Sequence, residues 1–487
     1  MTGCVQRPAI VTTANAAAIA ALSLAQVSAV AMPPSQGAVV AGRSKQVVET
    51  ALARQTIPGV SVAIVSDGRI VLDRAYGLSD VAKRTLAGPG TSFEIGSITK
   101  QFTAAAILQL EERGELRLSD RLGRYVPEYA RAQAVTIEEL LYQTSGIPDH
   151  INDVPGAVKV ISSSPGTFGQ AVALVKNLPL HFKPGTQYEY SNTNYLLLGM
   201  IVARVSHEPF DVYIAKNIFG PAHMTHSAFL KDEPSLTNMA VGYAFTPAGN
   251  LAPAGHIGYG WSGGAGSIVS TAGDVARWDL AFFDGRIVSP SDVARAIAPA
   301  RLNGISTGYG FGWDVDRLDG IPILSHGGAM LGFTSVNDVF PSLHANIVVL
   351  TNSGNSSPDA IAKGILASMD PEFARRRNAA SPGENPSVTA QIRTVWTQLH
   401  RGTIDRSQLT RSFSGLLDPA RLSYMHSHFA AYDSGPQRWI FKGKQTTPDA
   451  STTYTYRVLF PRSGLALLVT ASIAQDGKVA GCDTDYD

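Results

Sequence analysis

Apolar residues gather into strand-like runs at two places far apart in the chain. Residues 60–65 form a run that is apolar except for Ser61, and the turn signal Asp67-Gly68 separates it from a second run at 70–72. This pattern predicts a buried strand and its hairpin partner. Four more strand patterns, each bounded by Gly, Pro, Asp or Asn, follow much later, at residues 309–315, 321–324, 333–340 and 347–351.

The residues between these strands favour helices. Apolar residues recur at helical spacing from Phe102 to Leu110, and Gly114 stands where such a helix would end. Thr136 and Glu139 form a capping-box pattern that opens another helix. Strands at both ends of a helical middle predict an α+β fold, in which helices flank an antiparallel sheet and a helical lobe is inserted between its halves.

A second, smaller domain is predicted near the end of the chain. Residues 371–387 are polar and rich in Pro and Gly, so we interpret them as a linker after a first domain of residues 32–370. Residues 388–487 combine a helical pattern at 392–399 with an alternating strand at 454–458. They predict a small C-terminal α+β domain that carries no motif with a known chemistry.

The first residues resemble an export signal. Arg7 precedes an Ala-rich apolar stretch, and Ala29-Val30-Ala31 offers a small-x-small cleavage site. We therefore expect a signal peptide over residues 1–31 and a periplasmic or secreted bacterial protein. The stretch is too short and too interrupted to span a bilayer, so no stable membrane insertion is expected. Its removal would take Cys4 and leave Cys482 without a disulfide partner.

Composition excludes some classes of partner. The 40 Lys+Arg and 39 Asp+Glu residues nearly cancel, and the formal net charge is +1. Without a basic block the chain lacks the charge that binding a phosphate backbone requires, so nucleic acid is not an expected partner. A chain of 487 residues with 44% hydrophobic residues is long and apolar enough to bury real cores.

The chemistry begins at Ser97 and Lys100. Ser97 is the only serine in the chain with a lysine three residues later, a spacing that places both on one face of a helix. A lysine whose pKa is depressed can take the proton of a serine hydroxyl and make it a nucleophile. Taken alone, the pair is also typical of an ordinary helix start. Two further motifs add to it, Tyr190-Ser191-Asn192 and His326-Gly327-Gly328-Ala329.

These three motifs, in this order, resemble the serine β-lactamase and penicillin-binding protein superfamily, in particular its class C β-lactamase-like branch. The resemblance covers about residues 50 to 355 and implies a serine hydrolase that forms an acyl-enzyme without a cofactor. Flanking segments that share the resemblance are residues 91–96, 140–146, 182–185, 264–271 and 332–335.

The resemblance implies a role for each motif residue. Ser97 attacks a carbonyl, while Lys100 and a partly ionised Tyr190 shuttle its proton. Asn192 orients the lysine and the substrate amide. The backbone N–H groups of Ser97 and Ala329 form an oxyanion hole. The residues expected to contact the substrate are Gly327, Gly328 and Gln143.

The third motif departs from the commonest pattern of the family. His326 replaces a lysine, and Gly327 replaces a hydroxyl residue. A neutral imidazole beside a glycine holds a substrate carboxylate less well, which favours an ester or a D-amino-acid-type peptide over a β-lactam. With a pKa near the reference value of about 6.5, His326 is expected to lose its proton between pH 5 and 8.

Other functions stay open at this point. A β-lactamase or D-alanyl-D-alanine carboxypeptidase would use the same residues, and so would a receptor that penicillin acylates without turnover. A sensor of that kind needs a transmembrane link, and none is visible. The sequence leaves the oligomeric state open.

Two other patterns, one typical of a different hydrolase family and one of a metal site, do not fit the residues around them. Gly260-Trp261-Ser262-Gly263-Gly264 matches the nucleophile elbow of α/β-hydrolases, but Pro253 and Gly255 stand where the elbow needs a strand. His223 and His226 have no carboxylate at ligand spacing, so we expect no metal site.

Overall fold

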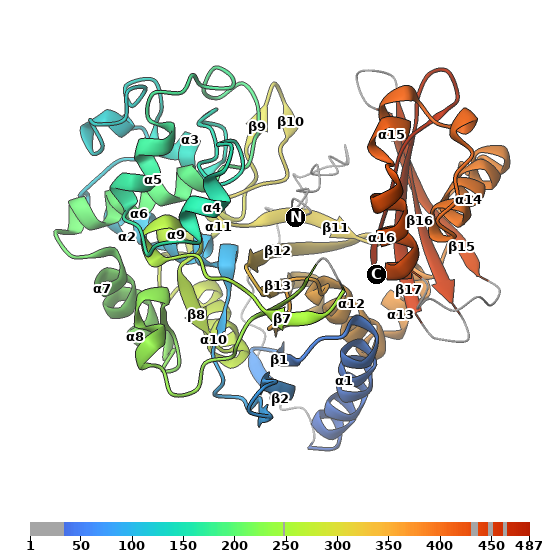
Figure 1. Ribbon diagram of the computed structural model, residues 1–487. Coiled ribbons are helices and arrows are strands. Elements are labelled where there is room, and N and C mark those ends of the chain that lie inside the picture. Colours follow the sequence, from blue (N-terminus) through green and yellow to red (C-terminus); the bar gives the residue numbers. More distant parts are fainter. Residues whose placement is uncertain (1–33, 247–248, 430–436, 447–450, 461–464) are drawn as a thin grey trace. The chain divides into compact units, whose positions relative to one another are not determined.

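The computed structural model describes residues 34–246, 249–429, 437–446, 451–460 and 465–487 (Figure 1). The predicted signal peptide and Cys4 lie outside the described residues. The chain divides into two compact units, Met1–Ile365 and Leu366–Asp487. The division falls within helix α12 (Pro358–Met369), and helix α13 (Pro371–Arg377) occupies the first part of the segment expected to be a linker.

A seven-stranded antiparallel sheet forms the centre of the first unit, with the strand order β11-β12-β13-β14-β1-β2-β3. Its central pairing joins the two ends of the unit, because Val60 pairs with Thr351 and Ser66 with Ala345. The predicted antiparallel sheet is therefore confirmed. The strands are β1 (Gly59–Ser66), β2 (Arg69–Asp80), β3 (Thr85–Leu86), β11 (Asp314–Leu318), β12 (Ile321–Met330), β13 (Phe333–Phe340) and β14 (Ala345–Thr351).

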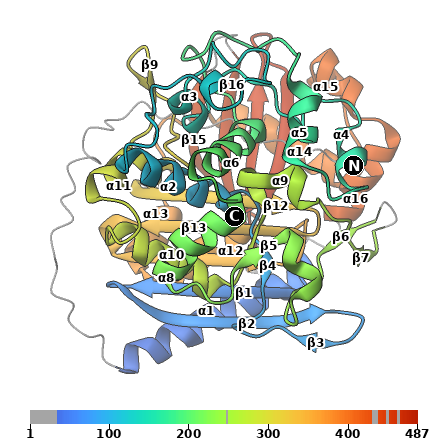
Figure 2. The same cartoon turned by 90° about the vertical axis from the view of Figure 1, so that its left-hand side faces the viewer.

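Helices cover both faces of this sheet. Helix α10 (Ala272–Phe283) packs on β1, β2 and β14, and α1 (Pro34–Gln55) packs on β1 and β2. Figures 1 and 2 show α10 on one face and α1 with α12 on the other. Burial on both faces explains why the central strands are almost continuously apolar in the sequence.

The helical lobe lies between the two halves of the sheet in the sequence. Helix α6 (Asn192–Ser206) packs against α2 (Thr99–Glu112), α3 (Ile137–Leu141) and α9 (Tyr259–Gly266). The capping box is confirmed: Thr136 Oγ1 accepts from Glu139 N at 3.2 Å, and Glu139 Oε2 accepts from Thr136 N at 2.7 Å.

Shorter elements complete this unit. Its other helical segments are η2 (Gly96–Ile98), η3 (Leu122–Arg124), α4 (Ala157–Ile161), α5 (Phe168–Val175), α7 (Phe210–Ile214), the π-helical turn η4 (Ala215–Phe219), α8 (Gly220–Ala222), η5 (Leu230–Ser235), α11 (Pro290–Ala296) and η6 (Pro341–Leu343). Its small sheets are β4 (Phe93–Glu94) with β8 (Ile268–Ser270) and β5 (Ala228–Phe229), β6 (Tyr243–Phe245) with β7 (Leu251–Pro253), and β9 (Arg301–Leu302) with β10 (Ile305–Ser306).

The strand expected at residues 309–315 begins only at Asp314. Tyr309–Trp313 form a turn, in which Gly310 N donates to Trp313 O at 2.8 Å. Gly312 has φ +75°, and a Cβ there would lie 2.9 Å from the backbone of Lys100 and Gln101. The turn therefore needs glycine, and it packs against the start of helix α2 while Tyr309 is buried.

The second unit is a four-stranded antiparallel sheet with helices, which agrees with a small α+β fold. Tyr454, Tyr456 and Val458 of the predicted alternating strand are all buried. Its elements are α14 (Pro386–His400), η7 (Arg406–Gln408), α15 (Arg411–Leu416), α16 (Pro419–Phe429), β15 (Arg438–Thr446), β16 (Thr452–Phe460), β17 (Leu465–Ile473) and β18 (Val479–Tyr486). Within the described residues of the whole chain, no helix has both the length and the apolar character that crossing a bilayer requires.

Candidate active site

Ser97 lies in the tight turn η2, which leads directly into helix α2. The turn depends on Gly96, which has φ +50° and whose Cβ, if present, would lie 2.7 Å from Ala329 N. Only glycine allows both the left-handed backbone and this close approach. The turn leaves Ser97 partly exposed and brings its backbone beside strand β12, where the predicted oxyanion-hole residue Ala329 is located.

Lys100 follows one turn later and is fully buried. Its Nζ donates to three oxygens: Ser97 Oγ at 2.9 Å, Asn192 Oδ1 at 2.9 Å and Ala265 O at 2.8 Å. Burial lowers the pKa of Lys100 to about 7, while the charge of Asp149 acts in the opposite direction. Near neutral pH this amine can therefore both lose and regain a proton.

Tyr190 precedes helix α6 and faces the same lysine. Lys100 Nζ lies 4.8 Å from the centroid of the Tyr190 ring, and the nearby Ser97 side chain acts to lower the pKa of Tyr190. Burial raises the pKa of Tyr190 well above its usual value. The expectation of a partly ionised tyrosine is wrong, because desolvation outweighs the lowering effect of Ser97. Tyr190 is a neutral hydroxyl that can donate and accept.

Asp149 fixes the orientation of Asn192, and sequence reasoning missed it. Its Oδ2 accepts from Asn192 N at 3.1 Å and from Asn192 Nδ2 at 2.8 Å. Because the amide nitrogen is held by Asp149, the amide oxygen faces Lys100 Nζ. Asp149 is buried and lies 43 residues before Asn192, so no local motif connects the two.

Gln143, for which a substrate contact is predicted, is fully buried. Its Oε1 accepts from Ser191 N at 3.1 Å and from Asn194 Nδ2 at 2.6 Å. Gln143 itself has φ +59°, an uncommon conformation for a residue with a side chain. In this position it holds the segment that carries Tyr190 and Asn192.

The third motif forms part of strand β12, at the edge of the site. A Cβ on Gly328 would lie 2.1 Å from Ile95 O, so the glycine lets the strand approach the turn before Ser97. Ser335 Oγ on the neighbouring strand donates to the same Ile95 O at 2.9 Å. Gly327 differs, since it is exposed and the nearest atom to a Cβ there is Ser335 O at 3.8 Å.

His326 is a buried, neutral side chain. Its Nδ1 lies 2.6 Å from Gly327 O and therefore carries the proton, so Nε2 accepts from the Tyr309 hydroxyl at 3.1 Å. Burial, with the charge of Lys100, lowers the pKa of His326 to about 3. The expectation that His326 changes its charge between pH 5 and 8 is wrong, because only 3% of the residue is exposed.

The rival nucleophile Ser262 lies in helix α9 and is buried, with its Oγ 3.4 Å from Gly258 O. The glycines around it serve packing: a Cβ on Gly264 would lie 2.5 Å from Tyr195 O of helix α6. Close contact of the two helices brings the backbone oxygen of Ala265 to Lys100.

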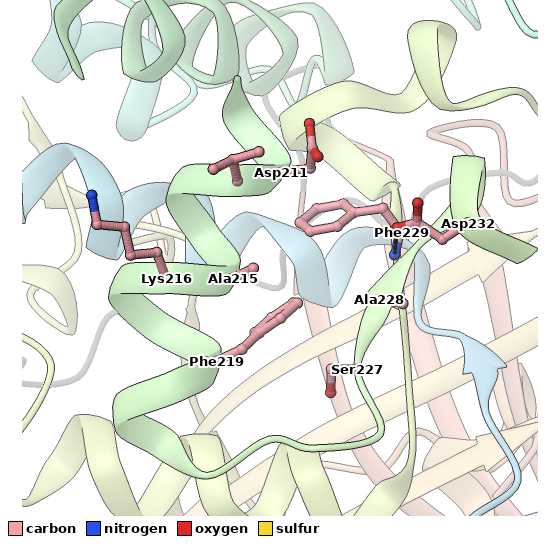
Figure 3. Close-up of a pocket in the computed structure, with 9 residues that line it drawn as sticks. Asp211, Ala215, Lys216, Phe219, Ser227, Ala228, Phe229 and Asp232 are labelled. Atoms are coloured by element: carbon pink, nitrogen blue, oxygen red, sulfur yellow. Dashed lines mark hydrogen bonds between the residues drawn. The ribbon is translucent and has the colours of Figure 1, made fainter. Parts of the chain in front are cut away.

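A cavity of about 500 Å³ lies elsewhere in this unit, beside the π-helical turn η4 (Figure 3). Figure 3 shows Lys216 pointing away from Asp211, Phe229 and Asp232. Of the described residues, those that line it include no member of the three motifs: Asp211, Val212, Ala215, Lys216, Phe219, Ser227, Ala228, Phe229 and Asp232. The motifs, rather than this cavity, therefore identify the candidate site.

A comparison with protein-family models agrees with the resemblance that the three motifs indicated. The Beta-lactamase family model matches residues 45–368. The chain belongs to this family. It is thus a member of the serine β-lactamase and penicillin-binding protein superfamily of serine hydrolases. A relative, Protein flp of Staphylococcus aureus strain COL, is 30% identical over 319 residues, which are 63% of this chain. The match spans 62% of that protein, less than two thirds of its length.

Solved structures show the same fold. The octameric penicillin-binding protein homologue from Pyrococcus abyssi has a TM-score of 0.62 at 21% identity, covering 92% of this chain and 96% of that one. The D-amino acid amidase from Ochrobactrum anthropi SV3 has a TM-score of 0.58 at 24% identity, covering 69% of this chain and 98% of that one. At these identities the likeness concerns the fold alone.

Proposed function

We propose that the protein hydrolyses a neutral ester or amide through an acyl-enzyme on Ser97. The observation that supports this most is the position of Lys100, whose buried Nζ lies 2.9 Å from Ser97 Oγ. A base in hydrogen-bond contact with a serine hydroxyl, with a pKa near the working pH, is what activates such a nucleophile.

The hydrogen bonds of Lys100 explain how it acts as that base. A neutral amine has two N–H groups and one lone pair. The fixed acceptors Asn192 Oδ1 and Ala265 O take the two N–H groups, which leaves the lone pair directed at the Ser97 hydroxyl. The proton of Ser97 passes to Lys100 as Oγ attacks the substrate carbonyl.

The remaining steps use groups that surround Ser97. We assign the developing oxyanion to the N–H groups of Ser97 and Ala329, each worth roughly 2.7–4 kcal/mol in such sites. The proton on Lys100 then reaches the leaving group through the neutral Tyr190 hydroxyl, and the bond to the leaving group breaks. A water molecule, deprotonated by the same residues, hydrolyses the ester formed with Ser97 and releases the acid.

The third motif favours a substrate without a carboxylate at this position. His326 is neutral and uses both ring nitrogens inside the protein, and Gly327 offers no hydroxyl. An ester or a D-amino-acid-type amide fits such a site better than a β-lactam or a peptide that ends in D-alanine. D-amino acid amidases share the fold of this chain, so their amide substrates belong among the compounds to be tested. The signal-peptide pattern supports a periplasmic or secreted protein.

Intact-mass labelling tests the proposal. A fluorophosphonate should add one group to the wild-type protein and none to Ser97→Ala, and a panel of short esters and D-amino acid amides should be turned over. Penicillin hydrolysis faster than any ester or amide would assign the β-lactamase activity instead. A penicillin adduct that persists, without turnover of any ester or amide, would identify a receptor.

A further inference from the structure

Three side chains from separate segments lie together near Ser97 and take no part in its proposed reaction. Glu94 ends strand β4, Glu233 belongs to the turn η5, and His256 lies in the loop before helix α9. One ligand atom of each lies within 4.8 Å of the others. His256 Nδ1 is 3.2 Å from Glu94 Oε1, and its Nε2 is 2.5 Å from Glu233 Oε2. We call these three residues the Glu94 cluster.

The carboxylates of this cluster have unused oxygens. Glu94 is 2% exposed, and among the described residues none donates a hydrogen bond to either of its carboxylate oxygens. Oε1 of Glu233 is likewise buried without a hydrogen bond. A buried carboxylate with unsatisfied oxygens is costly unless a cation compensates its charge. A single imidazole, in contact with one oxygen of each glutamate, leaves this compensation incomplete.

We propose that Glu94, Glu233 and His256 bind a divalent transition-metal ion of the Zn²⁺ type. Two carboxylate oxygens and one imidazole nitrogen are ligands that Zn²⁺ accepts, whereas Ca²⁺ and Mg²⁺ prefer oxygen alone. Zinc needs ligand atoms about 2.0–2.2 Å from the ion, so the three ligand atoms, which lie within 4.8 Å of one another, must move closer together. His256 can supply this movement, because 60% of its side chain is exposed and a turn of the ring frees one nitrogen.

The position of the cluster gives the ion a structural role. Glu94 lies three residues before Ser97 and pairs with Val269 of strand β8. Its neighbour Ile95 accepts the hydrogen bond from Ser335 that holds the turn before the nucleophile. An ion would tie η5 and the His256 loop to this strand. The inference does not depend on the proposed activity, so its test measures binding alone.

Zinc titration of the untagged, metal-free full chain tests the proposal. Calorimetry should show one Zn²⁺ per chain with a dissociation constant in the micromolar range or below, and Co²⁺ should give a visible absorption band from the same site. Glu94→Gln and His256→Ala should each weaken binding by about tenfold or more. The matched control is His181→Ala, which alters an exposed cluster of similar composition, Asp153, His181 and Glu189, and should leave the affinity unchanged.

Three results would overturn the metal site. They are a dissociation constant weaker than about 1 mM, an affinity that both cluster variants leave unchanged, and an affinity that His181→Ala abolishes. The first would mean that the Glu94 cluster is an ion triad only. Circular dichroism checks that each variant is folded, and Glu233→Gln replaces any variant that is not. At a Co²⁺ concentration near the wild-type dissociation constant, the absorption band should be much weaker in the folded cluster variants than in the wild type.

Discussion

The Tyr309 hydroxyl donates to His326 Nε2 at 3.1 Å, and the two side chains are buried together in the core, where the imidazole of the third motif is neutral. Both residues lie in contact with the ring of Tyr190, whose centroid is 6.0 Å from that of Tyr309 and 6.1 Å from that of His326. A position that carries a lysine in the family's commonest pattern is here part of an aromatic cluster. The charge of the site therefore depends on Lys100.

The first prediction concerns acid stability. The folded-state pKa of His326 is about 3, whereas an unfolded histidine has about 6.5. Between these values only the unfolded chain binds the proton, so stability is lost as pH falls from 6.5, by about 1.4 kcal/mol per pH unit from this residue. Denaturant unfolding at pH 7, 6 and 5 should show a shallower loss in His326→Asn than in wild type. If the free energy of unfolding fell equally with pH in both proteins, the burial of a neutral histidine would be contradicted.

The second prediction is the pH profile of hydrolysis. Because Lys100 must be deprotonated to accept the proton of Ser97, kcat/KM for a neutral ester should rise through pH 7 and level off above it. Tyr190 stays protonated, so its ionisation should produce no decrease below pH 9. Initial rates across pH 5 to 9 measure the profile. A flat profile would remove Lys100 as the base.

The third prediction removes the nucleophile and the base. Ser97→Ala should abolish both fluorophosphonate labelling and turnover. Lys100→Ala should lower kcat by about 10²–10⁴-fold, since the two residues act as one unit. Lys83→Ala, an exposed lysine paired with Asp80 at the surface, is the control and should keep wild-type rates. Turnover by Ser97→Ala at an undiminished rate would exclude this site.

The fourth prediction compares two adjacent glycines. Gly327 has room for a side chain, with the nearest atom 3.8 Å from a Cβ, so Gly327→Ser should fold normally. The new hydroxyl should raise kcat/KM for a carboxylate-bearing substrate relative to a neutral ester by about 10-fold or more, because a hydrogen bond to a charged group contributes roughly 1.5–3 kcal/mol.

Gly328→Ser is the contrasting variant. A Cβ there meets backbone oxygen at 2.1 Å, so the same substitution should destabilise the fold by about 1–3 kcal/mol or more and displace the turn before Ser97. Thermal unfolding and the substrate ratio measure both variants. If Gly327→Ser and Gly328→Ser had the same thermal stability and substrate ratio, the close approach of strand β12 to Ile95 O would be contradicted.

The fifth prediction identifies Asp149 as a positioning residue. Its charge raises the pKa of Lys100 and its Oδ2 holds the Asn192 amide. Asp149→Asn should therefore shift the midpoint of the pH profile below 7 and lower kcat more than it raises KM. Asp284→Asn, at an exposed aspartate beside Arg286, controls for general loss of charge. A lowered kcat with an unmoved midpoint would mean that Asp149 acts on structure alone.

The sequence predicts those parts of the site that lie within short motifs. Ser97 and Lys100 share one helix turn, and the strands around them follow from local apolar patterns. Asp149 and Tyr309 reach the site through tertiary contacts, which local motifs do not predict. Ala265 contributes only a backbone oxygen, so its residue type gives no sign of this role.

The ionisation states could not be predicted either. A pKa depends on how much water surrounds a group, and this depends on packing between distant segments. The motif around His326 does not reveal that the side chain is buried beside Tyr309, which follows the turn that glycine allows at position 312. The prediction of a strand over residues 309–315 was wrong for residues 309–313 for the same reason, because the local sequence pattern does not reveal the turn there.

The pairing of β1 with β14 has a consequence for synthesis. Val60 meets Thr351 in the centre of the sheet, so a chain still growing on the ribosome has already produced Ser97, Lys100 and Tyr190 when the partner of β1 does not yet exist. Contacts between such distant residues form slowly because the intervening loop must close first. The sheet beside these residues therefore cannot be completed until residue 351 has been added and has left the exit tunnel.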